Sequence, residues 1–259
     1  MAKPKIHPTS IIDPDAKLAD GVEIGPFCIV GKKVKVGKNT KFTSNVVIEH
    51  TEIGKDCTVY PFTSIGLPPQ DIRYKEEKTK VKIGNNNVIR EYSTVHRASI
   101  SGDKVTSIGN NNFFMAYVHI AHDCKVGNHV IMANASTLGG HVVVDDYCFL
   151  GGLVAVHQFS RIGAYSMIGG FSAITRDIPP YTTASGDRAK LYGLNAIGLK
   201  RQNFSDAQIR SLKQAYKLLF RSKLTVKEAI ALLRQEGNLS EEVRNIIDFI
   251  EENKRGICR

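Results

Sequence analysis

The sequence lacks the paired cysteines of a disulfide framework or of a thiolate metal site. Its five cysteines are an odd number and form no Cys-x-x-Cys pair, which argues against disulfide bonds and against a zinc site built from thiolates. Four of them follow a repeated apolar residue by four positions, where other repeats hold small residues: Cys28, Cys57, Cys124 and Cys148. We therefore expect these cysteines to fill small buried sites, and we do not expect Cys124 to be a nucleophile.

Long apolar runs and the common nucleotide motifs are also missing. No apolar segment approaches about 18 residues, so we expect no stable membrane insertion. The first residues contain no apolar segment of the signal-peptide type, which indicates a cytoplasmic protein. Neither a Walker A pattern nor a G-x-G-x-x-G motif after a strand is present.

Acidic residues are outnumbered by basic ones. Lysine and arginine total 35, aspartate and glutamate total 25, and the formal net charge is +10. A basic surface suits an anionic partner such as a nucleic acid, a nucleotide, an acidic carrier protein or a membrane surface. The charge alone does not choose among these partners.

The sequence does contain a long repeat with a period of six residues. From Ile108 to Ile174 every sixth residue is apolar: Ile108, Phe114, Ile120, Val126, Met132, Leu138, Val144, Leu150, Val156, Ile162, Ile168 and Ile174. This period fits neither an isolated helix nor a strand of a flat sheet, and it is typical of a parallel β-helix. Three hexapeptides make one triangular coil, so residues 18 apart should stack at about 4.8 Å. The known folds with this repeat coil left-handed.

The repeat begins at Ile6, slips by one residue before Ile53, and is interrupted twice. The interruptions, 67–80 and 96–107, predict loops that leave the solenoid. The segment Asp177-Ile178-Pro179-Pro180 predicts the end of the solenoid, because proline cannot donate to a continuing ladder.

Helical periodicity follows that segment. It predicts one helix over 206–221 with Ser205 as its N-cap, a second opened by Thr225 and stopped by Gly237, and a third opened by Ser240. The predicted fold is mainly β: a left-handed parallel β-helix over 1–190, followed by a small C-terminal α-helical domain over 191–259.

Stacking by 18 gathers polar residues into three neighbouring columns. The strip contains His96, His122, Asp123, Gly140, His141, His157 and Gln158. A histidine beside a carboxylate suits general-base work, and a glycine N–H one coil away suits a developing oxyanion. The strip therefore favours acyl transfer from a thioester, with His122 as the base.

Two other interpretations of the strip remain. The histidines can be ordinary residues of a polar face. They can also hold a metal ion, as in hexapeptide carbonic anhydrases, but His119-x-x-His122 is shorter than the His-x-x-x-x-His spacing of that class. We expect no metal.

A second cluster of polar residues lies further along the chain. Lys200 and Arg201 suit a diphosphate, and Asn195 suits a base edge. Ordinary surface charge explains this cluster equally well.

Several of these segments resemble those of a known enzyme family. The segments are Val118-His-Ile-Ala-His-Asp-Cys124, Gly140-His141, Gly151 to Phe159 and Gly198-Leu-Lys-Arg201. They are similar to those of the UDP-N-acetylglucosamine acyltransferases, which open lipid A biosynthesis. The resemblance implies a homotrimer with active sites between adjacent solenoids. It also implies transfer of an (R)-3-hydroxyacyl group from acyl carrier protein to the 3-position of UDP-GlcNAc, with no cofactor and no nucleic acid.

The resemblance also implies roles for individual residues. His122 is the general base, Asp123 orients it, and the Gly140 N–H meets the oxyanion. The sugar and acyl pocket is lined by His96, His119, His141, His157 and Gln158, and is reached from the first loop by Gln70, Asp71 and Arg73. Asn195 and Arg201 bind the nucleotide, and Gly170, at the position that limits acyl length, suggests a long chain.

The sequence departs from the family at three positions. Arg73 replaces a lysine of many members, Gln202 an arginine of some, and Ile197 a glutamate of some, which affects nucleotide and sugar contacts rather than the reaction. Transfer to a 3-amino sugar, a CoA-dependent acetyltransferase of the same fold and a purely structural solenoid are the alternatives. The basic charge suits an acidic acyl carrier protein.

Overall fold

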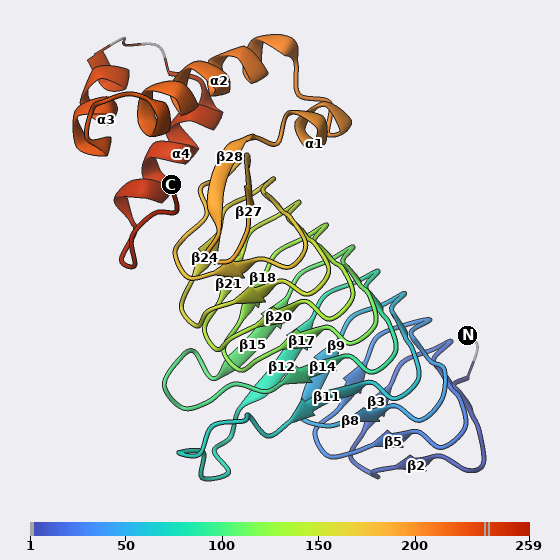
Figure 1. Cartoon of the computed structure of the whole chain (residues 1–259). Coiled ribbons are helices and arrows are strands. Elements are labelled where there is room, and N and C mark those ends of the chain that lie inside the picture. Colours follow the sequence, from blue (N-terminus) through green and yellow to red (C-terminus); the bar gives the residue numbers. More distant parts are fainter. Residues whose placement is uncertain (1–2, 236, 238) are drawn as a thin grey trace.

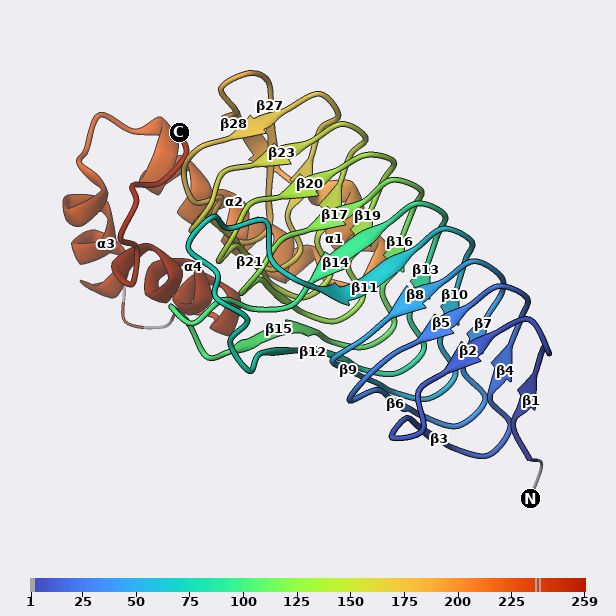
Figure 2. The same ribbon diagram turned by 90° about the horizontal axis from the view of Figure 1, so that it is seen from below.

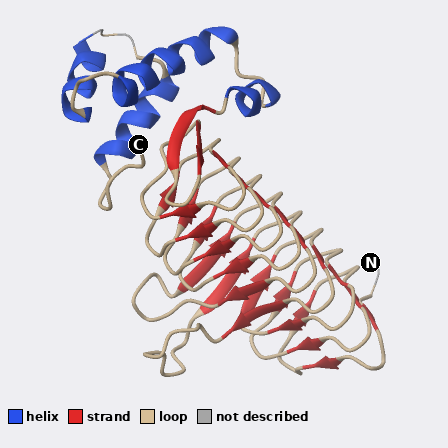
Figure 3. Cartoon of the chain, in the orientation of Figure 1, coloured by secondary structure: helices blue, strands red, loops and turns tan. Residues whose placement is uncertain are grey.

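The computed structural model describes residues 3–235, 237 and 239–259. The chain winds into a prism of stacked coils, and the helices gather at the C-terminal end of the prism (Figure 1). A second view shows that the coils run along one axis from the N-terminus to the helices (Figure 2). Short strands joined by turns make up the prism, and the helices are confined to the C-terminal end (Figure 3).

Three sheets form the sides of the prism, and all their strand pairs are parallel except β27 (Thr182–Ser185) with β28 (Lys190–Leu194). The 11-stranded sheet contains β1 (Lys5–Ile6), β4 (Glu23–Ile24), β7 (Lys41–Phe42), β10 (Thr58–Val59), β13 (Val88–Ile89), β16 (Phe113–Phe114), β19 (Ile131–Met132), β22 (Phe149–Leu150), β25 (Met167–Ile168), β27 (Thr182–Ser185) and β28 (Lys190–Leu194). The nine-stranded sheet contains β2 (Ile11–Ile12), β5 (Ile29–Val30), β8 (Val47–Ile48), β11 (Ser64–Leu67), β14 (Thr94–His96), β17 (His119–Ile120), β20 (Thr137–Leu138), β23 (Ala155–Val156) and β26 (Ala173–Ile174). The eight-stranded sheet contains β3 (Lys17–Leu18), β6 (Lys35–Val36), β9 (Thr51–Ile53), β12 (Lys80–Ile83), β15 (Val105–Ile108), β18 (Lys125–Val126), β21 (Val143–Val144) and β24 (Arg161–Ile162).

The register confirms that residues 18 apart stack in the uninterrupted part of the chain. Met132 pairs with Leu150, and Leu150 pairs with Ile168. The second residue of each of these strands points to the axis and is buried, whereas the first faces outward. Burial of this apolar column on every side of the prism explains why the period of six is strict.

Both predicted interruptions leave the prism on the same edge, between the nine-stranded and the eight-stranded sheet. The first loop lies between β11 and β12, and the second between β14 and β15. The strands around them keep their partners, because Val95 still pairs with Ile120 and Ser107 with Lys125. The insertions therefore project without breaking the ladder.

The prediction that the solenoid ends at Asp177-Ile178-Pro179-Pro180 is wrong, because the parallel ladder continues beyond this segment. Ile178 still bridges to Ile162, and β27 pairs in parallel with β25, so the 11-stranded sheet gains one more strand. The two prolines are tolerated because they lie in the turn before β27, where the Pro179 carbonyl accepts hydrogen bonds from the hydroxyls of Ser166 and Thr182. The chain then reverses, and β28 pairs antiparallel with β27. The predicted boundary at 190/191 falls inside β28.

The C-terminal helices are α1 (Ala196–Arg201), α2 (Asp206–Arg221), α3 (Val226–Gln235) and α4 (Glu241–Glu251). Ser205 caps α2 and Ser240 caps α4, as predicted, and Thr225 exchanges hydrogen bonds with Glu228 at the start of α3. Gly237 adopts a positive φ of 77° after α3. The short α1 was not predicted. Among the described residues, no helix is both long and apolar enough to cross a membrane.

Candidate active site

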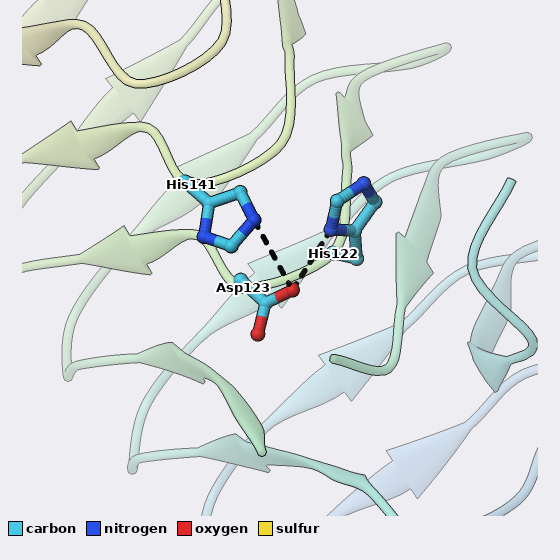
Figure 4. Close-up of side chains that lie close together, drawn as sticks. All are labelled: His122, Asp123 and His141. Atoms are coloured by element: carbon cyan, nitrogen blue, oxygen red, sulfur yellow. Dashed lines mark hydrogen bonds and ion pairs between the residues drawn. The ribbon is translucent and has the colours of Figure 1, made fainter. Parts of the chain in front are cut away.

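His122 and Asp123 occupy the turn between β17 and β18, on the edge that also carries the two loops. The Nδ1 atom of His122 lies 2.8 Å from Oδ2 of Asp123 (Figure 4). Because the carboxylate accepts a hydrogen bond from Nδ1, the lone pair of the imidazole is at Nε2. Among the described residues Nε2 has no hydrogen-bond partner, so it is free to accept a proton.

The second loop holds the Asp123 carboxylate in place. Ser99 donates to Oδ2 twice, from its backbone N–H at 2.9 Å and from its hydroxyl at 2.7 Å. Burial of the carboxyl would raise its pKa, but the hydrogen bonds from His122 and Ser99 hold that pKa below its usual value. Asp123 is therefore a buried carboxylate that keeps its charge.

Gly140 lies directly beneath the imidazole of His122. A methyl group on its Cα would lie 2.5 Å from Cε1 and 2.7 Å from Nε2 of that ring, so only glycine fits. Gly140 is buried, and its N–H donates to no acceptor among the residues that the structure describes. A buried backbone donor without a partner, beside a free imidazole nitrogen, is suited to bind an oxygen of a ligand.

His141 lies across Asp123 from His122. Its Nε2 is 3.7 Å from Oδ2 of Asp123, and its ring meets that of His122 edge to face at 5.3 Å (Figure 4). The other face of the His141 ring stacks on Phe159 at 4.5 Å. Burial lowers the pKa of His141 more than the Asp123 charge raises it, so the neutral form is favoured.

His96 and His119 form a second histidine pair beside the first. Their rings meet edge to face at 5.2 Å, and Nδ1 of His119 lies 2.6 Å from the Thr94 hydroxyl. Burial, together with the neighbouring histidines His119 and His122, lowers the pKa of His96 to about 4. Burial also lowers the pKa of His119. Both are thus neutral hydrogen-bonding groups near neutral pH.

The rest of the predicted strip lies one coil further along the prism. Leu138 pairs with Val156, and this register places His157 and Gln158 next to Gly139 and Gly140. Both side chains are exposed. Nδ1 of His157 lies 3.0 Å from the Gln158 carbonyl and 3.1 Å from Nη2 of Arg255. The histidine strip predicted from the period is therefore confirmed as a geometric feature.

A metal ion has one candidate position among the described residues. Ligand atoms of His122, Asp123 and His141 all lie within 4.8 Å of one another. However, Nδ1 of His122 is already bonded to Oδ2 of Asp123, and the same oxygen accepts two bonds from Ser99. These hydrogen bonds orient the imidazole without a metal ion, and they leave Oδ1 of Asp123 without a partner among the described residues.

The first loop brings charges to the same edge. Asp71 accepts hydrogen bonds from the Arg73 backbone and guanidinium, at 2.9 to 3.1 Å. These bonds from Arg73 lower the pKa of Asp71 to about 2. Gln70 is exposed beside them. The predicted loop residues thus lie on the edge of the prism that also carries His122.

Asn195 and Arg201 belong to a different cavity. It has a volume of about 1110 Å³ and is lined by strands of the 11-stranded sheet and by α1, with Phe113, Ile131, Phe149, Met167, Asn195 and Arg201 among its walls. None of the histidine strip lines it. The Asn195 amide is occupied, because it caps α1 at Gly198 and donates to the Tyr165 carbonyl at 2.9 Å. Gly170 is neither in the histidine strip nor among the residues that line this cavity; it lies in the turn between β25 and β26.

Two further observations bear on the sequence predictions. Burial raises the pKa of the Cys124 thiol to about 12, which agrees with the prediction that Cys124 is not a nucleophile. Ser99 was missed, as was Thr106, whose hydroxyl accepts from the Asp123 N–H at 2.9 Å. Both lie in or beside an insertion, where the repeat offers no register; a short polar run was their only signal.

Known proteins are similar to this chain over nearly its whole length. Residues 177–258 match the model for domain 2 of UDP-N-acetylglucosamine O-acyltransferase, and residues 15–50 and 106–140 match the bacterial transferase hexapeptide model. The chain is 62% identical over 256 residues to the acyl-[acyl-carrier-protein]–UDP-N-acetylglucosamine O-acyltransferase of Thermodesulfovibrio yellowstonii, covering 98% of this chain and 99% of that protein. It is 49% identical to the enzyme of the same name from Syntrophobacter fumaroxidans, covering 98% and 100%.

Solved structures of UDP-N-acetylglucosamine acyltransferases are also similar to this chain. The UDP-N-acetylglucosamine acyltransferase of Francisella novicida matches with a TM-score of 0.95 at 39% identity, over 98% of this chain and 94% of that one. The enzyme of Campylobacter jejuni matches with a TM-score of 0.94 at 41% identity, over 98% and 99%. With identities this high over nearly its full length, the chain belongs to the UDP-N-acetylglucosamine O-acyltransferase family.

Proposed function

We propose that this chain transfers an (R)-3-hydroxyacyl group from acyl carrier protein to the 3-hydroxyl of UDP-GlcNAc, in lipid A biosynthesis. The observation that carries the proposal is the imidazole of His122, which Asp123 orients at 2.8 Å above the N–H of Gly140. Neither Nε2 of His122 nor this N–H has a hydrogen-bond partner among the residues that the structure describes. Membership of the family supplies the substrate classes.

The reaction uses these groups in sequence. Nε2 of His122 removes the proton of the sugar 3-hydroxyl as its oxygen attacks the thioester carbon. The carbonyl oxygen becomes an oxyanion beside the Gly140 N–H, while Asp123 stabilises the imidazolium. The C–S bond then breaks, and the departing thiolate of the carrier takes the proton from His122. His96, His119, His141, His157, Gln158, Gln70, Asp71 and Arg73 line the sugar and acyl pocket in this proposal.

His122→Ala tests the catalytic assignment. Loss of a general base should lower kcat by about 10²-fold or more, while circular dichroism and the mass in solution stay unchanged. A folded variant with nearly normal kcat would remove His122 from the reaction and would favour a structural or binding role for the solenoid. Activity that is lost on chelation and restored by zinc would instead favour the metal interpretation.

We also propose a left-handed coil and a homotrimer. The outward residues of the nine-stranded sheet carry no lysine, arginine, aspartate or glutamate: Ile11, Ile29, Val47, Ser64, Thr94, His119, Thr137, Ala155 and Ala173. The eight-stranded sheet, in contrast, presents Lys17, Lys35, Glu52, Lys82, Lys125 and Arg161. On the edge between the 11- and nine-stranded sheets, exposed Phe62, Tyr92 and Tyr117 stack at 5.0 and 4.9 Å. An uncharged face next to an exposed aromatic edge supports burial between copies.

A trimer also explains why the predicted nucleotide residues lie apart from His122. The Arg201 cavity opens on the 11-stranded sheet, and His122 lies on the edge beyond the nine-stranded sheet. If these surfaces of neighbouring copies face each other, one complete site forms from two chains. Co-expressed His122→Ala and Arg201→Ala chains should then regain activity in mixed trimers, although each variant alone is impaired. Mixed trimers without recovery would refute the shared site.

Acyl carrier protein is the proposed donor because it is acidic and the helical end is basic. Arg210, Lys213 and Lys217 are exposed on α2, and they make no ion pair among the residues that the structure describes. We also propose the cytoplasm as the compartment. Mass spectrometry of the product from UDP-GlcNAc, or its 3-amino analogue, with mixed hydroxyacyl carrier proteins would distinguish ester from amide and report acyl length; a product made only from a CoA thioester would overturn the choice of donor.

A further inference from the structure

The first loop, residues 68–79, has almost no polar connection to the solenoid. Its own bonds are local: Tyr74 N–H donates to the Asp71 carbonyl at 3.0 Å, and the Tyr74 hydroxyl donates to the Glu77 carbonyl at 3.0 Å. Among the described residues, one hydrogen bond joins this loop to the rest of the chain. It runs from Nε of Arg97 to the hydroxyl of Tyr74, at 3.0 Å.

Arg97 is itself fixed from several directions. Only 6% of the residue is exposed. Its Nη1 donates to the Glu49 carboxylate at 2.6 Å and to the Gly66 carbonyl at 3.0 Å, and its backbone N–H donates to the Leu67 carbonyl at 3.1 Å. A guanidinium with this many oriented donors cannot move without leaving buried partners unsatisfied. Arg97 is therefore a rigid anchor, and its guanidinium also lies 5.5 Å from the centre of the Tyr74 ring.

The turn that precedes Tyr74 links the position of Tyr74 to that of Asp71. The N–H of Tyr74 closes a four-residue turn on Asp71, and within that turn Arg73 binds the Asp71 carboxylate through its backbone and its side chain. Because these hydrogen bonds fix the turn from Asp71 to Tyr74, a contact that fixes Tyr74 also fixes the position of Asp71. The loop that carries Asp71 leaves the prism between β11 and β12, on the same edge as His122 in the turn between β17 and β18.

We infer that Arg97 is a positioning residue, which acts through Tyr74 to hold Asp71 at the His122 site for the sugar substrate. This inference rests on the proposed function, because it assigns the loop to that reaction. Arg97 follows His96 directly, so the second loop begins with one residue in the histidine strip and one that anchors the first loop.

Two substitutions test the anchor with different risks to folding. Tyr74→Phe keeps the ring and removes the hydroxyl, and Arg97→Lys keeps the charge near Glu49 and removes the Nε donor. Each should lower kcat/KM for UDP-GlcNAc by about tenfold, the usual effect of losing a hydrogen bond to a charged group. Trypsin should cleave the native variants faster at Arg73, Lys75 and Lys78. Tyr192→Phe is the control, because Tyr192 is 69% exposed.

A double-mutant cycle with Asp71→Asn separates positioning from general damage. If Arg97 and Tyr74 act through Asp71, Asp71→Asn with Tyr74→Phe should be no worse than Asp71→Asn alone. Losses that multiply, or a Tyr74→Phe variant with unchanged kcat/KM and trypsin sensitivity, would overturn the inference. So would an Asp71→Asn variant of normal activity while His122→Ala is inactive, an outcome that leaves the proposed reaction standing. An active His122→Ala enzyme would refute the reaction itself.

Discussion

Replacing Gly140 with alanine tests whether His122 must lie where the structure places it. The added methyl would lie 2.5 Å from Cε1 of the imidazole, whereas ordinary carbon contacts are about 3.5–4.0 Å. The ring must therefore withdraw by roughly 1 Å, which would stretch its 2.8 Å contact with Asp123. A displacement of about 1 Å at a reacting group can cost about 10²-fold in rate, or about 2.7 kcal/mol of transition-state stabilisation.

The variant also separates two roles, since alanine keeps the backbone N–H of residue 140. We expect kcat/KM to fall by about 10²-fold, with unfolding and mass in solution close to normal. Gly152→Ala is the matched control: Gly152 follows β22 by two residues as Gly140 follows β20, and its added methyl would meet one atom, the Asn134 carbonyl oxygen, at 3.4 Å. Steady-state kinetics of both variants decide the matter. If Gly140→Ala were as active as Gly152→Ala, the inferred position of the base would be wrong.

Three other predictions follow from the same contacts. Ser99→Ala removes one of the donors to Oδ2 of Asp123 and should lower kcat by about fivefold; an unchanged kcat would show that the backbone donor suffices. The pKa of His96 is lowered from 6.5 to about 4, so between these values the unfolded chain binds a proton that the folded protein does not, and stability should fall as the pH decreases through this window. His96→Gln should flatten that slope in urea titrations, and His7→Gln, at an exposed position, should not; equal slopes in the wild type and His96→Gln would contradict the assignment. The triple change Arg210→Gln, Lys213→Gln and Lys217→Gln should raise KM for acyl carrier protein and weaken its salt dependence without changing KM for UDP-GlcNAc; an unchanged KM for the carrier would exclude α2 as the docking surface.

The solenoid could be predicted because each coil obeys the same physical demand. Every sixth residue points to the prism axis and must be apolar to fill it. The apolar residues from Ile108 to Ile174 therefore identify the inward positions of each coil. Adding 18 to a residue number then identifies its neighbour on the next coil, which is why His122, Gly140 and Gln158 could be placed in one column. The same reasoning failed at Pro179-Pro180, because proline blocks a ladder only where its missing N–H would have donated.

The contacts made by the insertions could not be predicted, because no repeat period fixes the positions of their residues. Arg97 and Ser99 lie in an insertion, where the position of a residue depends on contacts with Glu49, Tyr74 and Asp123 that are distant in sequence. The role of Asn195 stays a prediction: its residue type suits base recognition, and in the structure its amide caps α1.

The two insertions and the histidine strip share one edge for a physical reason. A repeat alone can place His122 above Gly140, but it cannot surround Asp123, because every position in a regular coil is committed to the ladder, the core or the outer face. Ser99 reaches Oδ2 only because the chain leaves the coil after β14 and returns at β15. The return restores the pairing of Ser107 with Lys125, so the irregular segment orients the carboxylate at no loss of register. A regular scaffold thus sets the spacing of His122 and the Gly140 N–H, and the insertions supply the irregular contacts that orient the His122 imidazole.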